Sequence, residues 1–496
     1  MTAPLVLVAL LASPTSPEPA RARTQAALDR IAQLDAQGPS LHAMIELNPD
    51  ALSIARSLDA KAPLASPLWG EPVVVKDNLD TGDKMQTTAG SLALAGAPAS
   101  RDSTVVARLR TAGMVLVGKT NLSEWANLRS THSSSGWSAR GGQTRNPYAL
   151  ARNPCGSSSG SAVAVAAGYT RMAECTETDG SIVCPSSVNG IVGLKPTVGL
   201  VSRAGIVPIS HSQDTAGPMA IDVLHTAQLL TAMAGSDPRD PTTAEADRHA
   251  TDYTKLLDAH ALQGARLGVV RKLAGFDPAV DKLFDAAIAA IRAAGATVVE
   301  VELPHRTDLG DDENLVLTTE FKADLNAYLA ARSGVPVHSL ADAIAFNAHH
   351  AAEEMPWFNQ EQFETAQARG PLTDQAYLEA RQRGQRMAGP EGLDAALGKE
   401  KLDALLAPTM GAAWLTDYLN GDQFSGGSAS QLPAIAGYPH LTVPMGAVRG
   451  MPIGLSFLGA KWSEPRLLAL GYAYERVAPA RVAPTFPVDV VPNLTR

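Results

Sequence analysis

Apolar residues between positions 280 and 291 recur at the spacing of an α-helix. Six of them follow one another at i, i+3, i+4, i+7, i+8 and i+11, which places them on a single face. They are Val280, Leu283, Phe284, Ala287, Ile288 and Ile291. Apolar runs lie on both sides, at residues 267–270 and 298–301, and Gly295 separates the helix from the second run. The pattern predicts a strand–helix–strand unit with a right-handed crossover.

The first half of the chain also alternates between amphipathic segments and short apolar runs. Residues 23–34 carry Ala27, Ile31 and Leu34 at helical spacing, and three valines at 73–75 lead into Lys76. We expect helices over 23–34, 105–112, 120–126 and 162–167, and strands over 73–76 and 114–117. Residues 132–160 are rich in Ser, Gly, Asn and Arg, which predicts loop. With no repeat and no clear linker, the pattern favours one large α/β domain.

Composition narrows the class of protein. The chain has 496 residues, of which 45% are hydrophobic and 18% charged, so it can bury a sizeable core and is not disordered as a whole. Its 41 basic and 50 acidic residues give a net charge of −9, which argues against a general binder of nucleic acid or of anionic membranes. No run of 18 apolar residues is present, so we expect no transmembrane helix.

The chain has three cysteines, Cys155, Cys175 and Cys184. An odd number in a chain of this length does not indicate a disulfide framework. No Cys-x-x-Cys or paired histidine spacing accompanies them, which argues against a zinc site.

Residues 1–22 differ from the rest of the sequence. Residues 4–12 form an apolar run, and a proline-rich stretch to Pro19 follows, as in a signal peptide and its cleavage zone. The basic start of a signal peptide is missing, since Arg21 is the first positive side chain. Residues 1–22 are therefore either a signal-peptide remnant or a disordered start, and the location stays open between secreted or periplasmic and cytoplasmic. We assign residues 23–496 to the folded domain.

Two stretches of small residues are the most unusual feature of the sequence. Residues 155–162 are Cys-Gly-Ser-Ser-Ser-Gly-Ser-Ala, and residues 176–182 are Thr-Glu-Thr-Asp-Gly-Ser-Ile. Small side chains let the backbone approach a substrate closely, although a flexible loop is the simpler interpretation of a Ser-Gly run. Residues 156–160 also match the G-x-S-x-G elbow of α/β-hydrolases. That elbow must follow a strand, whereas residues 146–154 contain two prolines and no β-run.

In these stretches the chain resembles the amidase signature family. The serine-rich core of the family is matched from Pro154 to Pro196, and further blocks match at residues 75–78, 118–121, 214–219 and 437–455. The resemblance extends over roughly residues 25–480. It implies a single α/β/α sandwich around a large mixed sheet, without a metal or an organic cofactor. Within the family, residues 135–143 and 177–185 look most like bacterial peptide amidases, which hydrolyse the C-terminal carboxamide of peptides.

The resemblance implies a Ser–cis-Ser–Lys triad. Ser181 matches the nucleophile, Ser157 the cis-serine that relays the proton, and Lys76 the base. A serine hydroxyl is a weak nucleophile until a base takes its proton. Lysine is such a base only when neutral, which requires a pKa lowered by burial or by cationic neighbours. Asp77 need not keep Lys76 charged, because successive side chains of a strand point to opposite faces.

Further residues of the site follow from the same resemblance. The oxyanion needs preorganised donors, and the resemblance assigns them to the backbone N–H groups of a loop. Ser158 is expected to support the site, with ordinary loop hydrogen bonding as the alternative. Two aromatic residues are expected to line the substrate pocket, with ordinary packing as the alternative. The loop residues are Thr178, Asp179, Gly180 and Ser181, and the aromatic residues are Trp137 and Tyr438.

Two features depart from the family pattern. Cys155 stands where the family commonly has Gly. Residues 169–175 include the charged Arg171 and Glu174 and end in Cys175, where the family is usually small and apolar and ends in Gly. In a strand, Arg171 and Glu174 would face opposite sides and would not pair. A buried charge without a partner costs several kcal/mol. We therefore expect either partners elsewhere or a displaced segment, which puts activity in doubt but not the fold.

The predicted activity is hydrolysis of the C-terminal carboxamide of peptides through an acyl-enzyme, with release of ammonia. One alternative is another amidase-signature activity, such as general acylamide hydrolysis or that of the A-type subunit of a glutamyl-tRNA amidotransferase. A second is a catalytically silent peptide-binding protein on the same scaffold. The expected partner is a small or peptide amide, not nucleic acid or a membrane, and the oligomeric state stays open.

Overall fold

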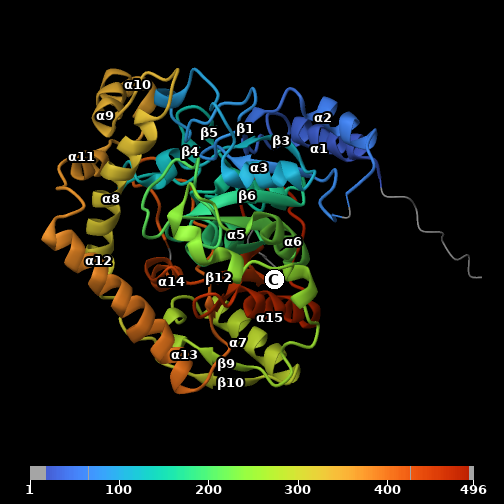
Figure 1. The fold of residues 1–496 in the computed structure, drawn as a ribbon. Coiled ribbons are helices and arrows are strands. Elements are labelled where there is room, and N and C mark those ends of the chain that lie inside the picture. The colour runs from blue at the N-terminus through green and yellow to red at the C-terminus, as the bar shows by residue number, and fades with distance from the viewer. Residues whose placement is uncertain (1–17, 65, 425, 491–496) are drawn as a thin grey trace, which may run out of the picture.

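A single large sheet organises the fold (Figure 1). The computed structural model describes residues 18–64, 66–424 and 426–490. The 11 strands of the sheet lie in the order β1-β3-β2-β6-β8-β7-β12-β13-β11-β9-β10. Their bounds are β1 Met44–Leu47, β2 Pro72–Lys76, β3 Val115–Thr120, β6 Met172–Glu177, β7 Val192–Lys195, β8 Thr215–Ala220, β9 Arg266–Val269, β10 Thr297–Glu300, β11 Ala404–Pro408, β12 His440–Val448 and β13 Met451–Leu458. Strand β2 is parallel to β3 and β6, whereas β8 is antiparallel to β6 and β7, so the predicted large mixed sheet is confirmed.

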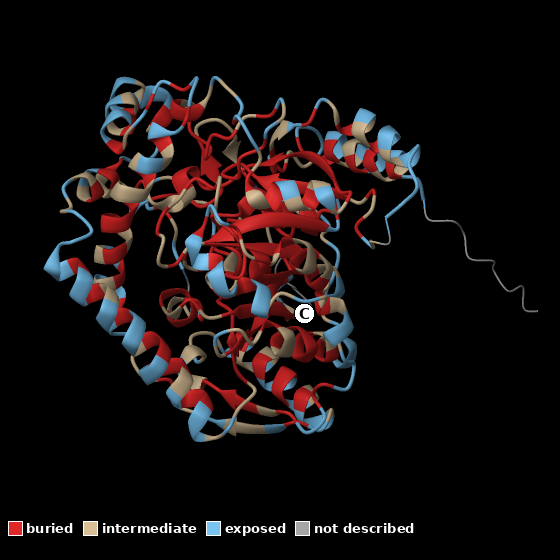
Figure 2. Cartoon of the chain, in the orientation of Figure 1, coloured by how far each residue is buried: buried red, intermediate tan, exposed pale blue. Residues whose placement is uncertain are grey.

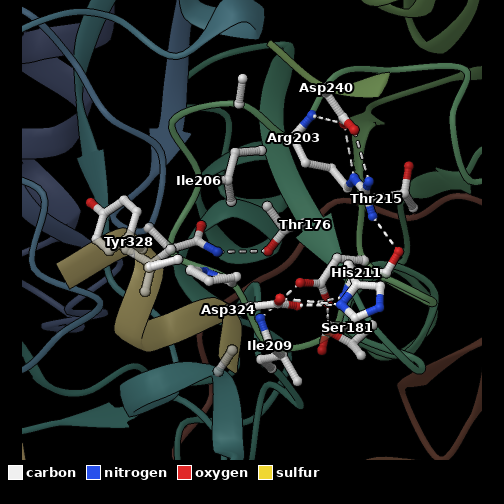
Figure 3. Close-up of a pocket in the computed structure, with 18 of the residues that line it drawn as sticks. Thr176, Ser181, Arg203, Ile206, Ile209, His211, Thr215, Asp240, Asp324 and Tyr328 are labelled. Carbon is white, nitrogen blue, oxygen red and sulfur yellow. Dashed lines mark hydrogen bonds and ion pairs between the residues drawn. The ribbon is translucent and has the colours of Figure 1, made fainter. Parts of the chain in front are cut away.

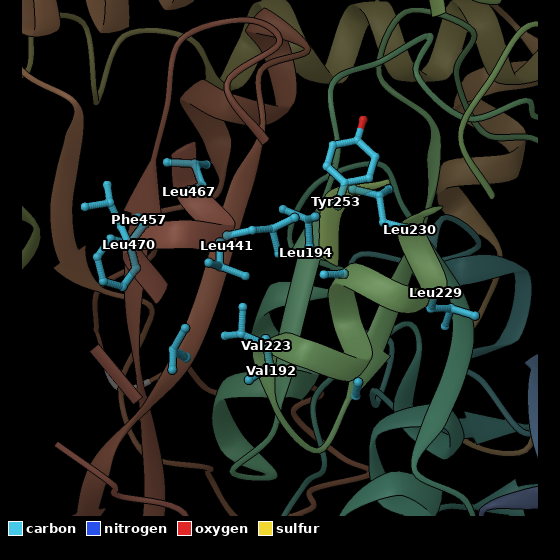
Figure 4. Packing of buried hydrophobic residues seen from close by; sticks show 14 of the residues in the cluster. Val192, Leu194, Val223, Leu229, Leu230, Tyr253, Leu441, Phe457, Leu467 and Leu470 are labelled. Atoms are coloured by element: carbon cyan, nitrogen blue, oxygen red, sulfur yellow. The ribbon is translucent and has the colours of Figure 1, made fainter. Parts of the chain in front are cut away.

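Helices cover both faces of this sheet. One core contains apolar side chains of α3, α6, α7 and α15, and a second contains those of α1, α4 and α5. In Figure 4, Val223 of α6 and Leu470 of α15 pack with Leu194 of β7 and Leu441 of β12. The helices are α1 Ala20–Leu34, α2 Ala51–Asp59, α3 Thr104–Thr111, α4 Ser159–Ala166, α5 Val183–Val188, α6 Val223–Met233, α7 Pro278–Ala293, α8 Gly310–Ala330, α9 Leu340–His349, α10 Ala351–Glu354, α11 Glu361–Gln367, α12 Gln375–Ala388, α13 Ala395–Lys399, α14 Gln431–Ala436 and α15 Glu464–Val477.

Helices α8 to α12 form a separate group beside the sheet. Figure 1 shows α8 and α12 along one side of the molecule, with α9, α10 and α11 near one end of α8. A third apolar core, which includes Phe321, Leu325 and Phe363, ties α8, α9 and α11 to the loops before α4. The exposed faces of these helices are blue in Figure 2, whereas the central strands of the sheet are red. Among the described residues, no helix is both long and apolar enough to cross a membrane.

Most elements with a strong periodicity lie where they were predicted. The amphipathic segment 280–291 is α7, and it joins the parallel neighbours β9 and β10. Helix α1 extends the prediction for 23–34 by one turn and begins at Ala20. The apolar run 4–12 lies outside the described residues. The loop at 132–160 holds one short hairpin, β4 Trp137–Ser138 and β5 Gly142–Gln143, and α4 begins at Ser159.

The helix predicted over 120–126 is wrong. Strand β3 continues through Thr120, and only a short 3₁₀ segment, Glu124–Asn127, follows. Trp125 and Ala126 have φ values of 47° and 53°, which lie in the left-handed region and are incompatible with a right-handed helix.

Candidate active site

The structure brings Lys76, Ser157 and Ser181 together, although they are far apart in the sequence. Lys76 ends β2, and Ser181 follows the parallel neighbour β6, so both lie at the same edge of the sheet. Ser157 lies just before α4, after a cis peptide bond with Gly156. The Ser157 Oγ atom is 2.8 Å from Lys76 Nζ and 3.0 Å from Ser181 Oγ. The three side chains are buried and form a continuous hydrogen-bonded chain.

Burial sets the charge of Lys76. It lowers the pKa of this amine to about 7, although the charges of Asp214 and Glu177 act in the opposite direction. The Nζ atom also lies 2.8 Å from Thr176 Oγ1. As predicted, Asp77 turns away, and its carboxylate accepts hydrogen bonds from Thr88 and Gly90. A substantial fraction of Lys76 is therefore neutral near neutral pH.

The loop of residues 178–181 is held by two carboxylates, those of buried Glu177 and half-buried Asp214. Glu177 accepts hydrogen bonds from the backbone N–H groups of Ile182 and Val183, at 2.6 and 3.0 Å. Asp214 accepts a hydrogen bond of 2.6 Å from Thr178 Oγ1. Within the described residues, the backbone N–H groups of 178–181 donate no hydrogen bond. They are thus available to an acceptor, and Gly180, with φ of 78°, provides the left-handed turn of the loop.

Two cavities meet at Ser181. The first, of about 390 Å³, is bordered by Ser157 and Thr176, by the apolar side chains of Ile206 and Ile209, and by polar residues. Figure 3 shows this cavity, with Asp324 of α8 beside His211 and with Tyr328 of α8 apart from Arg203 and Asp240. The second, of about 490 Å³, is bordered by Asp179, Cys155, Cys184, Met410 and Phe424. Thr178, Ser181, Ala126 and Ile209 border both cavities.

The polar side chains that border the first cavity form ion pairs and hydrogen bonds with one another. Arg203 binds Asp240 with an N–O distance of 2.8 Å. His211 Nδ1 is 2.9 Å from Asp324, and this hydrogen bond raises the pKa of the histidine. His211, Glu320 and Asp324 also lie close enough to bind a metal ion together. The Glu320 carboxylate, however, already accepts hydrogen bonds from Ser210, Ser212 and Tyr377, so we assign no metal to this cluster.

The remaining predicted site residues differ in their surroundings. Ser158 donates its hydroxyl to the backbone oxygen of Thr176 and its N–H to that of Ser181, so it links the two serine-bearing loops. Trp137 packs against Phe358 and Arg129, and the Tyr438 hydroxyl donates to Asp394. Neither aromatic side chain is among the described residues that border the two cavities.

For residues 169–175, which depart from the family pattern, we expected either charge partners elsewhere or a displaced segment. Within the part of the chain that it describes, the structure shows neither for Glu174. Strand β6 pairs in register with β2 and β8 and is not displaced. Arg171 lies before the strand and is exposed, whereas Glu174 is fully buried without a side-chain partner among the described residues. Burial raises the pKa of Glu174 well above its usual range, and the backbone N–H of Cys175 only partly offsets this. Burial therefore favours the neutral form of this acid.

Sequence reasoning missed several residues around the three predicted ones. Thr176, Glu177 and Asp214 lie within the motifs that match the family, so the sequence motifs could have indicated them. No sequence motif indicated the cavity wall that α8 supplies. One disulfide was also not anticipated, because the odd number of cysteines argued against a framework. It joins Cys155 to Cys184, with a Cα–Cα distance of 6.1 Å, and Cys175 is a free, buried thiol.

Comparisons with known proteins agree with this geometry. The family model described as Amidase matches residues 22–468. The native peptide amidase from Stenotrophomonas maltophilia is 51% identical with a TM-score of 0.90, over 95% of this chain and 96% of that one. A probable amidase of Arabidopsis thaliana is 40% identical over 92% of this chain and 87% of its own length. The A-type subunit of the glutamyl-tRNA(Gln) amidotransferase of Symbiobacterium thermophilum is 36% identical over 91% of this chain and 92% of its own length.

The family match spans nearly the whole domain, and the structural match extends over the same fold. The chain therefore belongs to the amidase signature family and is an amide-hydrolysing enzyme.

Proposed function

We propose that this amidase hydrolyses the C-terminal carboxamide of peptides, with Ser181 as the nucleophile. The observation that carries the proposal is the chain of hydroxyl and amine groups from Ser181 through Ser157 to Lys76. It lies beside a loop whose backbone N–H groups donate no hydrogen bond among the described residues. The likeness to a peptide amidase over 95% of this chain supports the peptide amide as substrate.

In the proposed reaction, neutral Lys76 takes a proton from Ser157 as Ser157 takes the proton of Ser181. The Ser181 oxygen attacks the carboxamide carbon, and the N–H groups of residues 178–181 stabilise the oxyanion. The protonated lysine returns the proton through Ser157 to the leaving nitrogen, and ammonia departs. Water then attacks the acyl-enzyme by the same proton route and releases the peptide acid.

The test is ammonia release from a short peptide amide, compared with free glutamine and a simple aliphatic amide. We expect release from the peptide amide and no turnover by Ser181→Ala. Ser186→Ala is the matched control, because Ser186 is buried nearby on α5 and its hydroxyl has no hydrogen-bond partner among the described residues. We expect this variant to keep its activity.

Other outcomes would favour the alternatives. Turnover of glutamine but not of the peptide amide would favour an amidotransferase A-type activity, which the similarity to the amidotransferase chain makes the second candidate. Binding of peptide amides without ammonia release would favour a catalytically silent protein. Full activity of Ser181→Ala would overturn the proposed nucleophile.

A further inference from the structure

We propose that the Cys155–Cys184 disulfide is a positioning cross-link for the two serines, and that its cleavage by a dithiol slows the reaction. This inference rests on the proposed function of Ser157 and Ser181. The bond joins the segment before one serine to the helix after the other. Cys155 lies two residues before Ser157, and Cys184 lies three residues after Ser181, in the first turn of α5.

The cross-link spans the junction across which the proton must move. The Ser157 and Ser181 hydroxyls meet there at 3.0 Å, and Ser158 N–H donates to Ser181 O at 3.2 Å. Cys184 is itself anchored to the nucleophile loop, since its N–H donates to Gly180 O at 2.8 Å. Hydrogen bonds between separate segments lengthen easily, whereas a covalent bond limits how far the segments can part. The disulfide therefore restricts the separation of the two hydroxyls.

The backbone at Cys155 supports this interpretation. Its φ of 57° lies in the left-handed region, which is unfavourable for a residue with a side chain but not for glycine. Such a conformation persists when the surroundings enforce it. The Cys155 side chain is buried in the second apolar core, and its sulfur lies 3.7 Å from Gly156 O. The covalent bond to Cys184 is the cross-link that glycine at this position cannot provide.

The bond is also accessible to small molecules, because both half-cystines border the 490 Å³ cavity beside Ser181. A thiolate of a small dithiol can attack one sulfur, breaking the protein S–S bond and forming a mixed disulfide. Its second thiol then displaces the protein sulfur. The dithiol is oxidised to a cyclic disulfide, and its two protons end on the two protein thiols. The enzyme would therefore be most active where disulfides persist, as in oxidising compartments.

The experiment compares the oxidised enzyme with enzyme reduced by dithiothreitol, with the thiols counted by alkylation. We would measure kcat and KM for the peptide amide and the labelling rate of Ser181 by a fluorophosphonate. Small displacements of reacting groups can cost about 100-fold in rate, so we expect a loss of that order in kcat and in labelling. KM and near-ultraviolet circular dichroism should stay unchanged, and reoxidation should restore the rate.

Three variants complete the test. Cys155→Gly removes the unfavourable left-handed conformation of a residue with a side chain, but it also removes the disulfide. We therefore expect a low rate that dithiothreitol does not alter. Cys184→Ser should behave in the same way. Cys175→Ala, which removes the free buried thiol, should respond to dithiothreitol as the unmodified enzyme does.

Several results would overturn the inference. Reduced enzyme with both thiols alkylated that labels at the oxidised rate would show that the bond does not position the serines. Loss of the folded state on reduction would make the bond a stabiliser of the fold instead. Loss of the dithiothreitol response in Cys175→Ala would assign the effect to that thiol. Because labelling requires no peptide, failure of peptide amide hydrolysis alone would contradict the proposed substrate and not the cross-link.

Discussion

Lys76 is the residue whose protonation sets the pH dependence of the proposed reaction. Burial lowers its pKa to about 7, and only the neutral amine can accept the proton relayed by Ser157. We therefore expect kcat/KM to rise as the pH increases through about 7 and to level off above it. Initial rates of peptide amide hydrolysis across this range would measure the profile. Lys76→Arg keeps its charge throughout and should be inactive.

Thr176 offers the variant that links this profile to Lys76. Its Oγ1 lies 2.8 Å from Nζ, and a hydrogen bond of this kind favours the charged amine. Thr176→Val keeps the shape but removes the acceptor. Because a hydrogen bond to a charged group is worth about 1.5 kcal/mol, the rise of the profile should move to lower pH by roughly one unit. If the pH profile of Thr176→Val does not move, a group other than Lys76 determines the rise of the rate with pH.

At the scale of the element, β6 contains Glu174, a buried acid with no side-chain partner in the part of the chain that the structure describes. Its ladder pairs Glu174 with Val75 on one side and Pro218 on the other, so the side chain cannot leave the interior while the sheet is intact. Its pKa is raised in the folded chain but not in the unfolded chain. Above about pH 4.3 the unfolded chain thus holds fewer protons, and folding becomes less favourable as the pH rises.

Glu174→Gln should remove this contribution to the free energy of unfolding. Between about pH 5 and the raised pKa of Glu174, the free energy of unfolding falls by about 1.4 kcal/mol for each unit of pH because of this residue. Urea unfolding at several pH values would therefore give a flatter dependence for Glu174→Gln. Glu379→Gln, at an exposed position of α12, is the control and should keep the slope of the unaltered protein. Equal slopes for Glu174→Gln and the unaltered protein would show that Glu174 is stabilised as a charged group.

For the whole molecule, the elements that could be predicted were those determined by residues close together in the sequence. The periodicity of 280–291 was sufficient for α7, because one buried face determines that helix, and the apolar runs on both sides of it predicted β9 and β10. The failure at 120–126 arose because the left-handed conformations of Trp125 and Ala126 have no signal in their residue types. The partnerless burial of Glu174 was equally hidden, since it depends on neighbouring strands that are distant in the sequence.

The candidate site divides in the same way. Lys76, Ser157 and Ser181 were predictable from motif resemblance, and no periodicity would have joined them across more than 100 residues of sequence. The disulfide was not predictable from the number of cysteines, because its partners meet only once the two serine-bearing loops are folded. The cavity wall from α8 carried no motif, and only the packing of that helix beside the sheet brings Tyr328 to the border of the cavity that Ser181 also borders.

This assembly of distant segments allows the two cavities to be distinguished. The 390 Å³ cavity combines apolar Ile206 and Ile209 with polar groups, as ligand sites commonly do, so we expect it to hold the peptide. Ala327 of α8 borders this cavity, whereas Ala330, one turn later and exposed, does not belong to the described lining. Ala327→Trp should therefore obstruct peptide amides, and Ala330→Trp is the matched control.

We expect Ala327→Trp to raise KM for peptide amides by about tenfold or more, a loss of about 1.4 kcal/mol in binding. Ser181 should still react with a small fluorophosphonate at the original rate, because the relay through Ser157 to Lys76 is untouched. Ala330→Trp should leave both measurements unaltered. An unchanged KM in Ala327→Trp would instead place the peptide in the 490 Å³ cavity, beside Phe424 and the disulfide.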